Sequence, residues 1–145
     1  MYNVNTERIH EILTYITDQI LPGLSAVMSS PKEAFLEDVP AGFAAERLFH
    51  LLIEGMTDIG NLLIDGFIMR DPGGYEDIVD IMEDERVYSP EQAFVYKQII
   101  LMRKKLVMEY TMNFREQLYT MYHRSVDVIH EYPALIRDYL AKELW

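Results

Sequence analysis

The chain has 145 residues, and half of them are hydrophobic, which suffices for a single domain with one core. Its formal net charge of −11 disfavours non-specific binding to RNA, because a long-range negative field repels phosphate. It contains no cysteine, which excludes disulfides and thiolate chemistry and fits a reducing cytoplasm, where we expect the protein to be located. No apolar run approaches the roughly 20 residues of a membrane span, and the N-terminus lacks a secretion signal, so we expect no membrane contact.

Apolar residues recur at helical spacing nearly throughout, and no run alternates as a half-buried strand would. The first predicted helix ends at the Leu-Pro-Gly sequence of 21–23. Its apolar face consists of Ile9, Ile12, Leu13, Ile16 and Ile20. Residues 29–42 are predicted to form a loop with one short helical turn, and a long helix follows from about Ala41 to Phe67.

Helix start and stop signals divide the second half of the chain. The Arg-Asp-Pro-Gly-Gly sequence of 70–74 ends the long helix, and a short helix is predicted over 75–85. At 89–92, Ser-Pro-Glu-Gln reads as a capping box with proline in the first helical position. A further helix is therefore predicted from this point to about Thr111.

The last predicted helix starts with Asn113 as its cap and with Glu116 reaching back to that cap. It runs to Pro133, where we expect it to kink or restart, and it continues past Ile136 and Leu140. The whole chain, residues 1–145, is therefore predicted to be a single all-α domain, a bundle of about five helices with short connections.

The long predicted helix carries three glycines and a polar stripe. Gly55, Gly60 and Gly66 predict the close approach of another segment, either from a second subunit or from within the monomer. The stripe is either a solvated face laced with ion pairs or one wall of a polar groove that holds cations. It consists of Arg47, His50, Glu54, Asp58, Asn61 and Asp65.

Two acid-x-x-His pairs resemble the ligand pattern of di-metal helical bundles. They are Glu7 with His10 and Asp127 with His130, and Glu54 or Asp58 would complete such a site. The alternative is that Glu7 and His10 are exposed residues in the first turn of a terminal helix.

A run of three cations stands in an otherwise apolar helix, in the sequence ILMRKKLVMEYTMNF. On a helix, Arg103, Val107 and Tyr110 would share one face, and Lys104 and Met108 would share a neighbouring one. Lys105 is expected to be solvated. In one interpretation Arg103 pairs with a nearby acid, and in the other it belongs to a functional site.

The segment RKKLVMEY resembles the signature R-N-x-x-V-H-x-Y of the HepT-like toxins, a branch of the HEPN superfamily of small all-helical domains. The similarity extends from residue 44 to residue 140 and includes the long helix and the Pro-x-x-Tyr sequence of 72–75. The resemblance implies a homodimer that pools its long and motif helices in a cleft. There the motif Arg and His cleave RNA without metal, and a small nucleotidyltransferase antitoxin silences the toxin by attaching AMP to the motif Tyr.

Carried over by position, Arg103, Val107 and Tyr110 match the family pattern, whereas Lys104 replaces Asn and Met108 replaces His. Methionine has no ionisable group, and loss of a positioned general base typically lowers a rate about 10²- to 10⁴-fold. The resemblance therefore implies a degenerate member, acting as a dimeric binding or regulatory module or as a toxin–antitoxin component.

The residues expected to bind a ligand or anion are Arg103, Lys104, Asp58 and Asn61, and Tyr110 is the candidate for modification. Neither a cofactor nor a metal is expected for this function. Two alternatives stay open. The first is an active ribonuclease that uses His50 or His123 as its base, and the second is the metal-dependent bundle described above.

Overall fold

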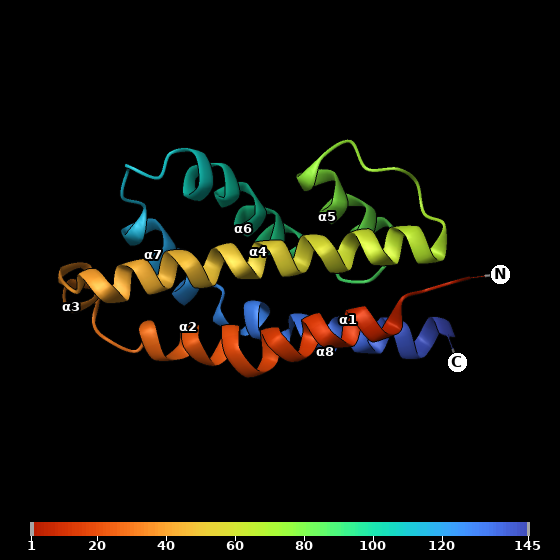
Figure 1. Cartoon of the computed structure of the whole chain (residues 1–145), viewed down its shortest axis with the longest axis horizontal. Helices are drawn as coiled ribbons and strands as arrows, with labels where there is room; N and C mark the ends of the chain where they lie inside the picture. The colour runs from red at the N-terminus through yellow and green to blue at the C-terminus, as the bar shows by residue number, and fades with distance from the viewer. Residues whose placement is uncertain (1, 145) are drawn as a thin grey trace.

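The computed structural model describes residues 2–144, and within these residues all regular structure is helical (Figure 1). Helix α1 (Thr6–Tyr15), the π-helix η1 (Ile16–Ile20) and α2 (Leu21–Val27) form one continuous rod. The other helices are α3 (Lys32–Glu37), α4 (Val39–Phe67), α5 (Tyr75–Asp84), α6 (Pro90–Met108), α7 (Arg115–Arg124) and α8 (Val126–Leu144). The predicted all-α class is confirmed, and residues 2–144 form seven helices in place of about five when the rod is counted as one.

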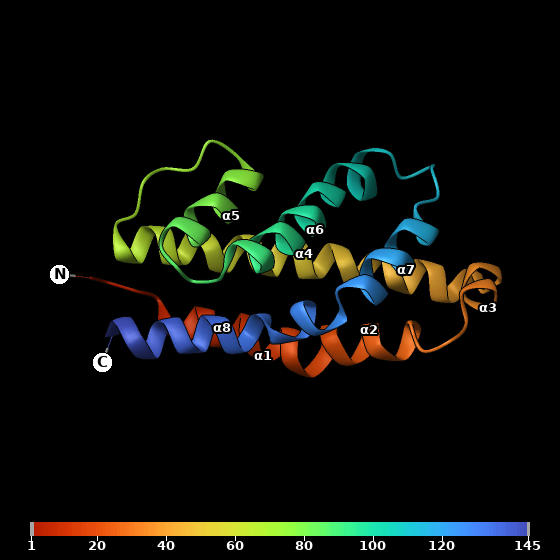
Figure 2. The same cartoon turned by 180° about the vertical axis from the view of Figure 1, so that it is seen from behind.

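Helix α4 lies between two layers of helices. Helices α5 and α6 cover one side of it, and the rod and α8 form the layer on the other side, as both views show (Figures 1 and 2). About half of its 29 residues are buried. In residues 2–144, no helix combines the length and the apolar character that crossing a membrane requires.

The ends of α4 follow from local sequence. The Asp38 side chain accepts a hydrogen bond of 3.0 Å from the backbone N–H of Ala41, with Pro40 in the first turn. At the other end Ile68 adopts the left-handed conformation, with φ of 57°, and Met69 N–H bonds back to the carbonyl of Ile64. The helix therefore begins two residues before the predicted start and ends where predicted.

The three glycines of α4 are explained by packing inside the monomer. A Cβ atom at Gly55 would contact Ile16 of η1, and one at Gly60 would collide with Ile78 of α5. At Gly66 it would lie 2.8 Å from the backbone Cα of Val4. Close approach from within the chain is thus the correct alternative.

The predicted helix end at 21–23 is wrong, because the helix continues through Pro22 to Val27. A proline inside an α-helix lacks the N–H donor, and its ring collides with the carbonyl four residues earlier. Here the preceding turn is a π-helix, in which the N–H of Leu21 bonds to the carbonyl of Ile16, five residues back. The wider turn accommodates the ring, so the chain bends around Pro22 without breaking the rod.

The C-terminal third also departs from expectation. The α7–α8 break falls at Ser125, with φ of −131°, whereas α8 runs through Pro133 without interruption. Asn113 is not the cap of α7: the N-cap position is Phe114, whose side chain makes no capping bond, and Asn113 lies one residue earlier, where its side chain accepts a hydrogen bond of 2.9 Å from Arg115 N–H. Glu116 does not reach back to Asn113 and instead pairs with Lys32 at 2.7 Å.

The start of α6 is confirmed in detail. Ser89 Oγ accepts a hydrogen bond of 3.2 Å from Gln92 N–H, and Gln92 Oε1 accepts one of 2.7 Å from Ser89 N–H. The helix ends at Met108 and not near Thr111, so Tyr110 lies in the following turn.

Replacing Gly60 with alanine is expected to destabilise the fold. Alanine has a higher helix propensity than glycine, worth about 1 kcal/mol. Placing its methyl group against Ile78 costs about 1–3 kcal/mol, because a β-branched side chain has few rotamers with which to move aside. Urea unfolding followed by circular dichroism measures the difference. Gly74→Ala is the control, since its Cβ would meet no atom within 4 Å. Parent-like stability of Gly60→Ala would contradict the close α4–α5 contact.

Candidate functional site

Arg103 is held between three helices, where α6 crosses α4 and the start of α5. Its Nε donates a hydrogen bond of 2.8 Å to Oε1 of Glu54, a residue of the polar stripe. Its guanidinium carbon lies 4.4 Å from the ring centroid of Tyr75, which is a cation–π contact. The hydrogen bond to Glu54 raises the pKa of Arg103, so the guanidinium stays charged.

The geometry leaves part of the guanidinium available. The hydrogen bond and the ion pair of Arg103 are both made by Nε, and its two terminal NH₂ groups bond to no residue of 2–144, so they remain as a fork of donors. Such a fork suits the bidentate recognition of a phosphate or carboxylate. Glu54 fixes the plane of this fork at one edge, and Tyr75 supports it from one face.

Two further members of the stripe extend this arrangement. His50 Nε2 lies 3.6 Å from the same Glu54 oxygen, and Arg47 Nη1 lies 3.3 Å from His50 Nδ1. Because arginine can only donate, Nδ1 is assigned as the acceptor, which places the proton of a neutral ring on Nε2, facing Glu54. The stripe is thus a wall that holds a cation, as one of the two sequence interpretations proposed.

Asp58 and Asn61, the other expected ligand-binding residues of the stripe, border a hollow of about 310 Å³. The hollow is also lined by Glu54, Thr57, Pro72, Gly73, Gly74, Tyr75 and Ile78. Thr57 is only 5% exposed, and within residues 2–144 its hydroxyl oxygen has no hydrogen-bond partner. Asp58 and Asn61 therefore lie beside the residues that position Arg103.

The outer wall of this hollow is the turn before α5, which is held by a compact set of bonds. Arg70 donates two hydrogen bonds to Asp77, of 2.8 and 2.9 Å, and Gly73 N–H donates a third of 2.8 Å. The Arg70 bonds and then the Gly73 bond lower the pKa of Asp77 to about 2. The carboxylate thus ties the turn to the first turn of α5.

Tyr110 does not share a face with Arg103, because α6 ends before it. The expectation of an Arg103–Tyr110 face is therefore wrong. The Tyr110 side chain is 77% exposed and borders a separate hollow of about 320 Å³, which is also lined by Arg47, His50 and Lys105. Lys104 is exposed on the surface of α6, and Met108 is 68% exposed at its last residue.

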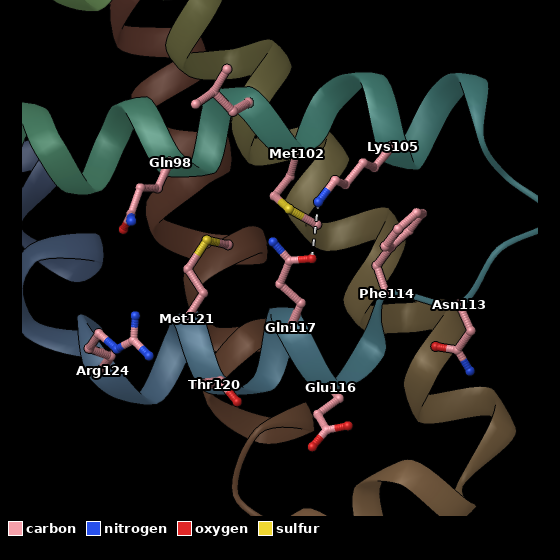
Figure 3. A pocket seen from close by; sticks show the side chains of 11 residues that line it. Gln98, Met102, Lys105, Asn113, Phe114, Glu116, Gln117, Thr120, Met121 and Arg124 are labelled. Carbon is pink, nitrogen blue, oxygen red and sulfur yellow. Dashed lines mark hydrogen bonds between the residues drawn. The ribbon is translucent and has the colours of Figure 1, made fainter.

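A hollow of about 700 Å³ lies between α6 and α7 (Figure 3). Lys105 borders it and donates a hydrogen bond of 3.3 Å to Gln117, drawn dashed in Figure 3. Lys105 is thus half-buried and bonded, where we expected it to be solvated. Residues two apart on a helix point about 200° away from one another, so Lys105 and Arg103 serve opposite sides of α6.

The acid-x-x-His pairs do not converge on a common point. Glu7 and His10 are exposed on α1, whereas His130 Nε2 lies 2.8 Å from the hydroxyl of Tyr122. Among residues 2–144, no group of three or more His, Asp and Glu side chains has a geometry that could hold a metal ion. Burial lowers the pKa of His130, which favours a neutral ring that bonds to this hydroxyl.

His123, the other alternative base, lies away from the motif. Its Nε2 lies 2.9 Å from the carbonyl oxygen of Met28, to which it donates, and its ring packs 4.3 Å from that of Tyr119. It links α7 to the end of α2. Of the two histidines considered as a substitute base, only His50 lies beside Arg103 and Glu54.

Tyr75 and Thr57 are the site residues that sequence reasoning missed. Tyr75 belonged to the matched Pro-x-x-Tyr sequence, but its contact with Arg103 joins positions far apart in the chain. Thr57 gave no signal at all, because a threonine on the buried side of a long helix usually bonds to its own backbone.

The described residues form an all-helical bundle in which α6 presents an arginine to a long helix with a polar stripe. A family model described as ribonuclease HepT-like matches residues 5–136, and the chain belongs to this family. A protein of Bacillus subtilis (strain 168) named "Putative RNase YutE" is 36% identical over 144 residues, which cover 99% of this chain and 95% of that protein. A solved structure of Bacillus subtilis YutE, described as a cytosolic protein of unknown function, matches at a TM-score of 0.86, with 36% identity over 99% of this chain and 96% of that one.

Replacing Thr57 with valine is expected to raise the free energy of unfolding by about 1 kcal/mol or more, because valine keeps the shape and removes a buried hydroxyl without a partner. Differential scanning calorimetry should show a higher Tm. Thr14→Val, on an exposed position of α1, is the matched control and should change the Tm little. A lower Tm for Thr57→Val would mean that the hydroxyl makes a favourable contact.

Proposed function

We propose that this protein is a HepT-like module that binds an anionic ligand at Arg103 and has lost the cleavage of RNA. The observation that carries the proposal is Met108, which stands at the position of the family's His and has no group that can accept or donate a proton. Arg103 is retained and is positioned by Glu54 and Tyr75. The scaffold and the anion contact are thus kept, whereas the base is absent.

The module acts as a homodimer in this proposal. Helix α6 supports this assembly, because it presents three exposed apolar side chains at a spacing of seven residues, which places them along one face. Phe94 is 64% exposed, Leu101 is 49% exposed and Met108 is 68% exposed. An apolar stripe of this kind on a monomer is a surface that a partner helix can cover.

Tyr110 is the proposed site of regulation by a small nucleotidyltransferase, which would transfer AMP from ATP to the phenolic oxygen and release pyrophosphate and the phenolic proton. The 77% exposure of this side chain gives an enzyme access to the phenol. Arg47, His50 and Lys105 line the same hollow and would place positive charge and donors beside the phosphate of the attached AMP. Modification would then add an anion close to the polar stripe.

A second candidate function is an active ribonuclease with His50 as its base. It is favoured by the 3.6 Å contact between His50 and the carboxylate that positions Arg103. An imidazole and a guanidinium on one carboxylate are the groups that proton transfer and charge stabilisation need. The family name and the RNase description of the Bacillus relative are consistent with this function.

Restoring the family motif is expected to create activity. The double variant Met108→His with Lys104→Asn should cleave single-stranded RNA about 10²- to 10⁴-fold faster than the parent, because it regains a base on an intact scaffold. Both positions are exposed, so the substitutions should leave the fold unchanged. The measurement is a gel assay with chelator present, and light scattering on the same samples should report dimers.

The matched control is the same double variant with Arg103→Lys, which keeps a cation beside Glu54 but removes the fork of donors and should lose the gained activity. Cleavage by the unmodified chain that disappears in His50→Ala would establish the second candidate and refute the proposed loss of cleavage. A monomeric mass would refute the proposed dimer.

Co-expression with a small nucleotidyltransferase of the antitoxin type is expected to add AMP at Tyr110. Intact-mass spectrometry should show the mass of one adenylyl group, and the addition should be absent from Tyr110→Phe. Tyr15→Phe is the control, since Tyr15 is also exposed, at 47%, but lies on α1. Modification at another residue, or no modification, would contradict the assignment of Tyr110.

A further inference from the structure

The hollow beside Tyr75 has the dimensions of a small-ligand site and offers a stacking surface. Its volume of about 310 Å³ is at the lower end of the range for ligand pockets. Tyr75 is 41% exposed, and Arg103 covers one face of its ring. Aromatic side chains with an accessible face stack favourably with planar bases.

Two polar side chains at the rim have complementary chemistry. Asp58 is exposed and presents a carboxylate that can accept two hydrogen bonds side by side, and Asn61 presents an amide that both donates and accepts. Guanine is the base with two adjacent donors, the ring N1–H and the exocyclic amino group, next to an acceptor oxygen. A carboxylate beside an amide matches that edge, whereas the corresponding edge of adenine has only one N–H donor group.

An independent observation indicates that a buried polar group at the hollow lacks a hydrogen-bond partner within residues 2–144. The hydroxyl of Thr57, on a side chain that is only 5% exposed, borders the hollow and is not hydrogen-bonded to any described residue. A buried hydroxyl in this state is unfavourable unless a ligand or water satisfies it. Gly74 on the opposite wall leaves open space where a side chain would otherwise stand.

The position of Arg103 completes the set of contacts. Glu54 and Tyr75 line the hollow and also contact the Arg103 guanidinium, so Arg103 lies behind these two lining side chains. We propose that this hollow binds the guanine base of a nucleotide, with Asp58 and Asn61 on its edge, Tyr75 against its face and the phosphate on Arg103. The inference rests on the proposed binding of an anion by Arg103 and names the ligand class.

Isothermal titration calorimetry on the full chain tests the proposal with guanosine 5′-monophosphate, adenosine 5′-monophosphate and inorganic phosphate. The guanine nucleotide should bind at least ten-fold more tightly than the adenine nucleotide. Two five-residue RNAs that differ only in a central G or A distinguish a guanine within an RNA strand from a free guanine nucleotide as the ligand. Discrimination between them means that the base is read within a strand, and discrimination only between the free nucleotides means a mononucleotide site.

Asp58→Asn should abolish the preference for guanine over adenine, because the amide replaces one acceptor with a donor. Asp65→Asn is the matched control, since Asp65 lies on the same stripe but does not border the hollow. Thr57→Val should weaken binding of the guanine nucleotide while keeping the fold. Arg103→Lys should weaken both nucleotides and phosphate.

Equal affinity for the two nucleotides, a preference that survives Asp58→Asn, or the absence of nucleotide binding would each overturn the guanine site. In each of those cases, the proposed function would still be supported if the parent chain binds phosphate and Arg103→Lys does not, because that result identifies an anion site at Arg103. RNA cleavage by the unmodified chain together with guanine preference would refute the loss of cleavage and support the guanine site.

Discussion

The constraint on which the rest of the structure depends is the burial of α4. All the other helices except α8 pack directly against it, so most of its circumference is covered along a length of about 44 Å. The glycines of α4 permit that coverage, since η1, α5 and the N-terminal segment each approach its backbone at one of them. The polar stripe lies where this coverage is incomplete, and there Glu54 reaches Arg103 of α6.

That stripe determines the chemistry of the site. Glu54 is the point at which α4 receives Arg103 from α6 and His50 from its own preceding turn. One carboxylate therefore orients two basic side chains, and the start of α5 adds Tyr75 as a support for the guanidinium. An arginine whose plane is fixed loses less freedom when it binds an anion, so its remaining donors are better prepared for a ligand.

The sequence predicted well those features that depend on a few neighbouring residues. The capping box of Ser89 forms as expected, and the polar stripe contains the partner of Arg103. The errors arose where distant contacts or unusual backbone override local signals. Pro22 is accommodated by a π-helical turn, which no residue type in the sequence predicts. The helix break lies at Ser125 and not at Pro133, where it was expected.

The position of Tyr110 shows the same limit within the site. Helical spacing places it beside Arg103 only if α6 continues, and a helix end is the least reliable feature of a sequence pattern. The contact of Tyr75 with Arg103 was beyond prediction for a different reason, because it depends on how the turn of 72–74 is tied by Asp77. A pattern of residue types identifies candidates, but it does not fix which of them meet.

The charge of the molecule bears on how the site selects a ligand. With a formal net charge of −11, the chain repels nucleic acid at long range, but at physiological salt such fields fade over a distance of about 8 Å. Within that distance Glu54 already offsets much of the charge of Arg103, so net attraction contributes little. Binding must then depend on the direction of individual donors and acceptors. If Arg103 binds an anion as proposed, the fixed guanidinium of this acidic protein would favour an anionic ligand whose other polar groups it also matches over a polyanion that offers charge alone.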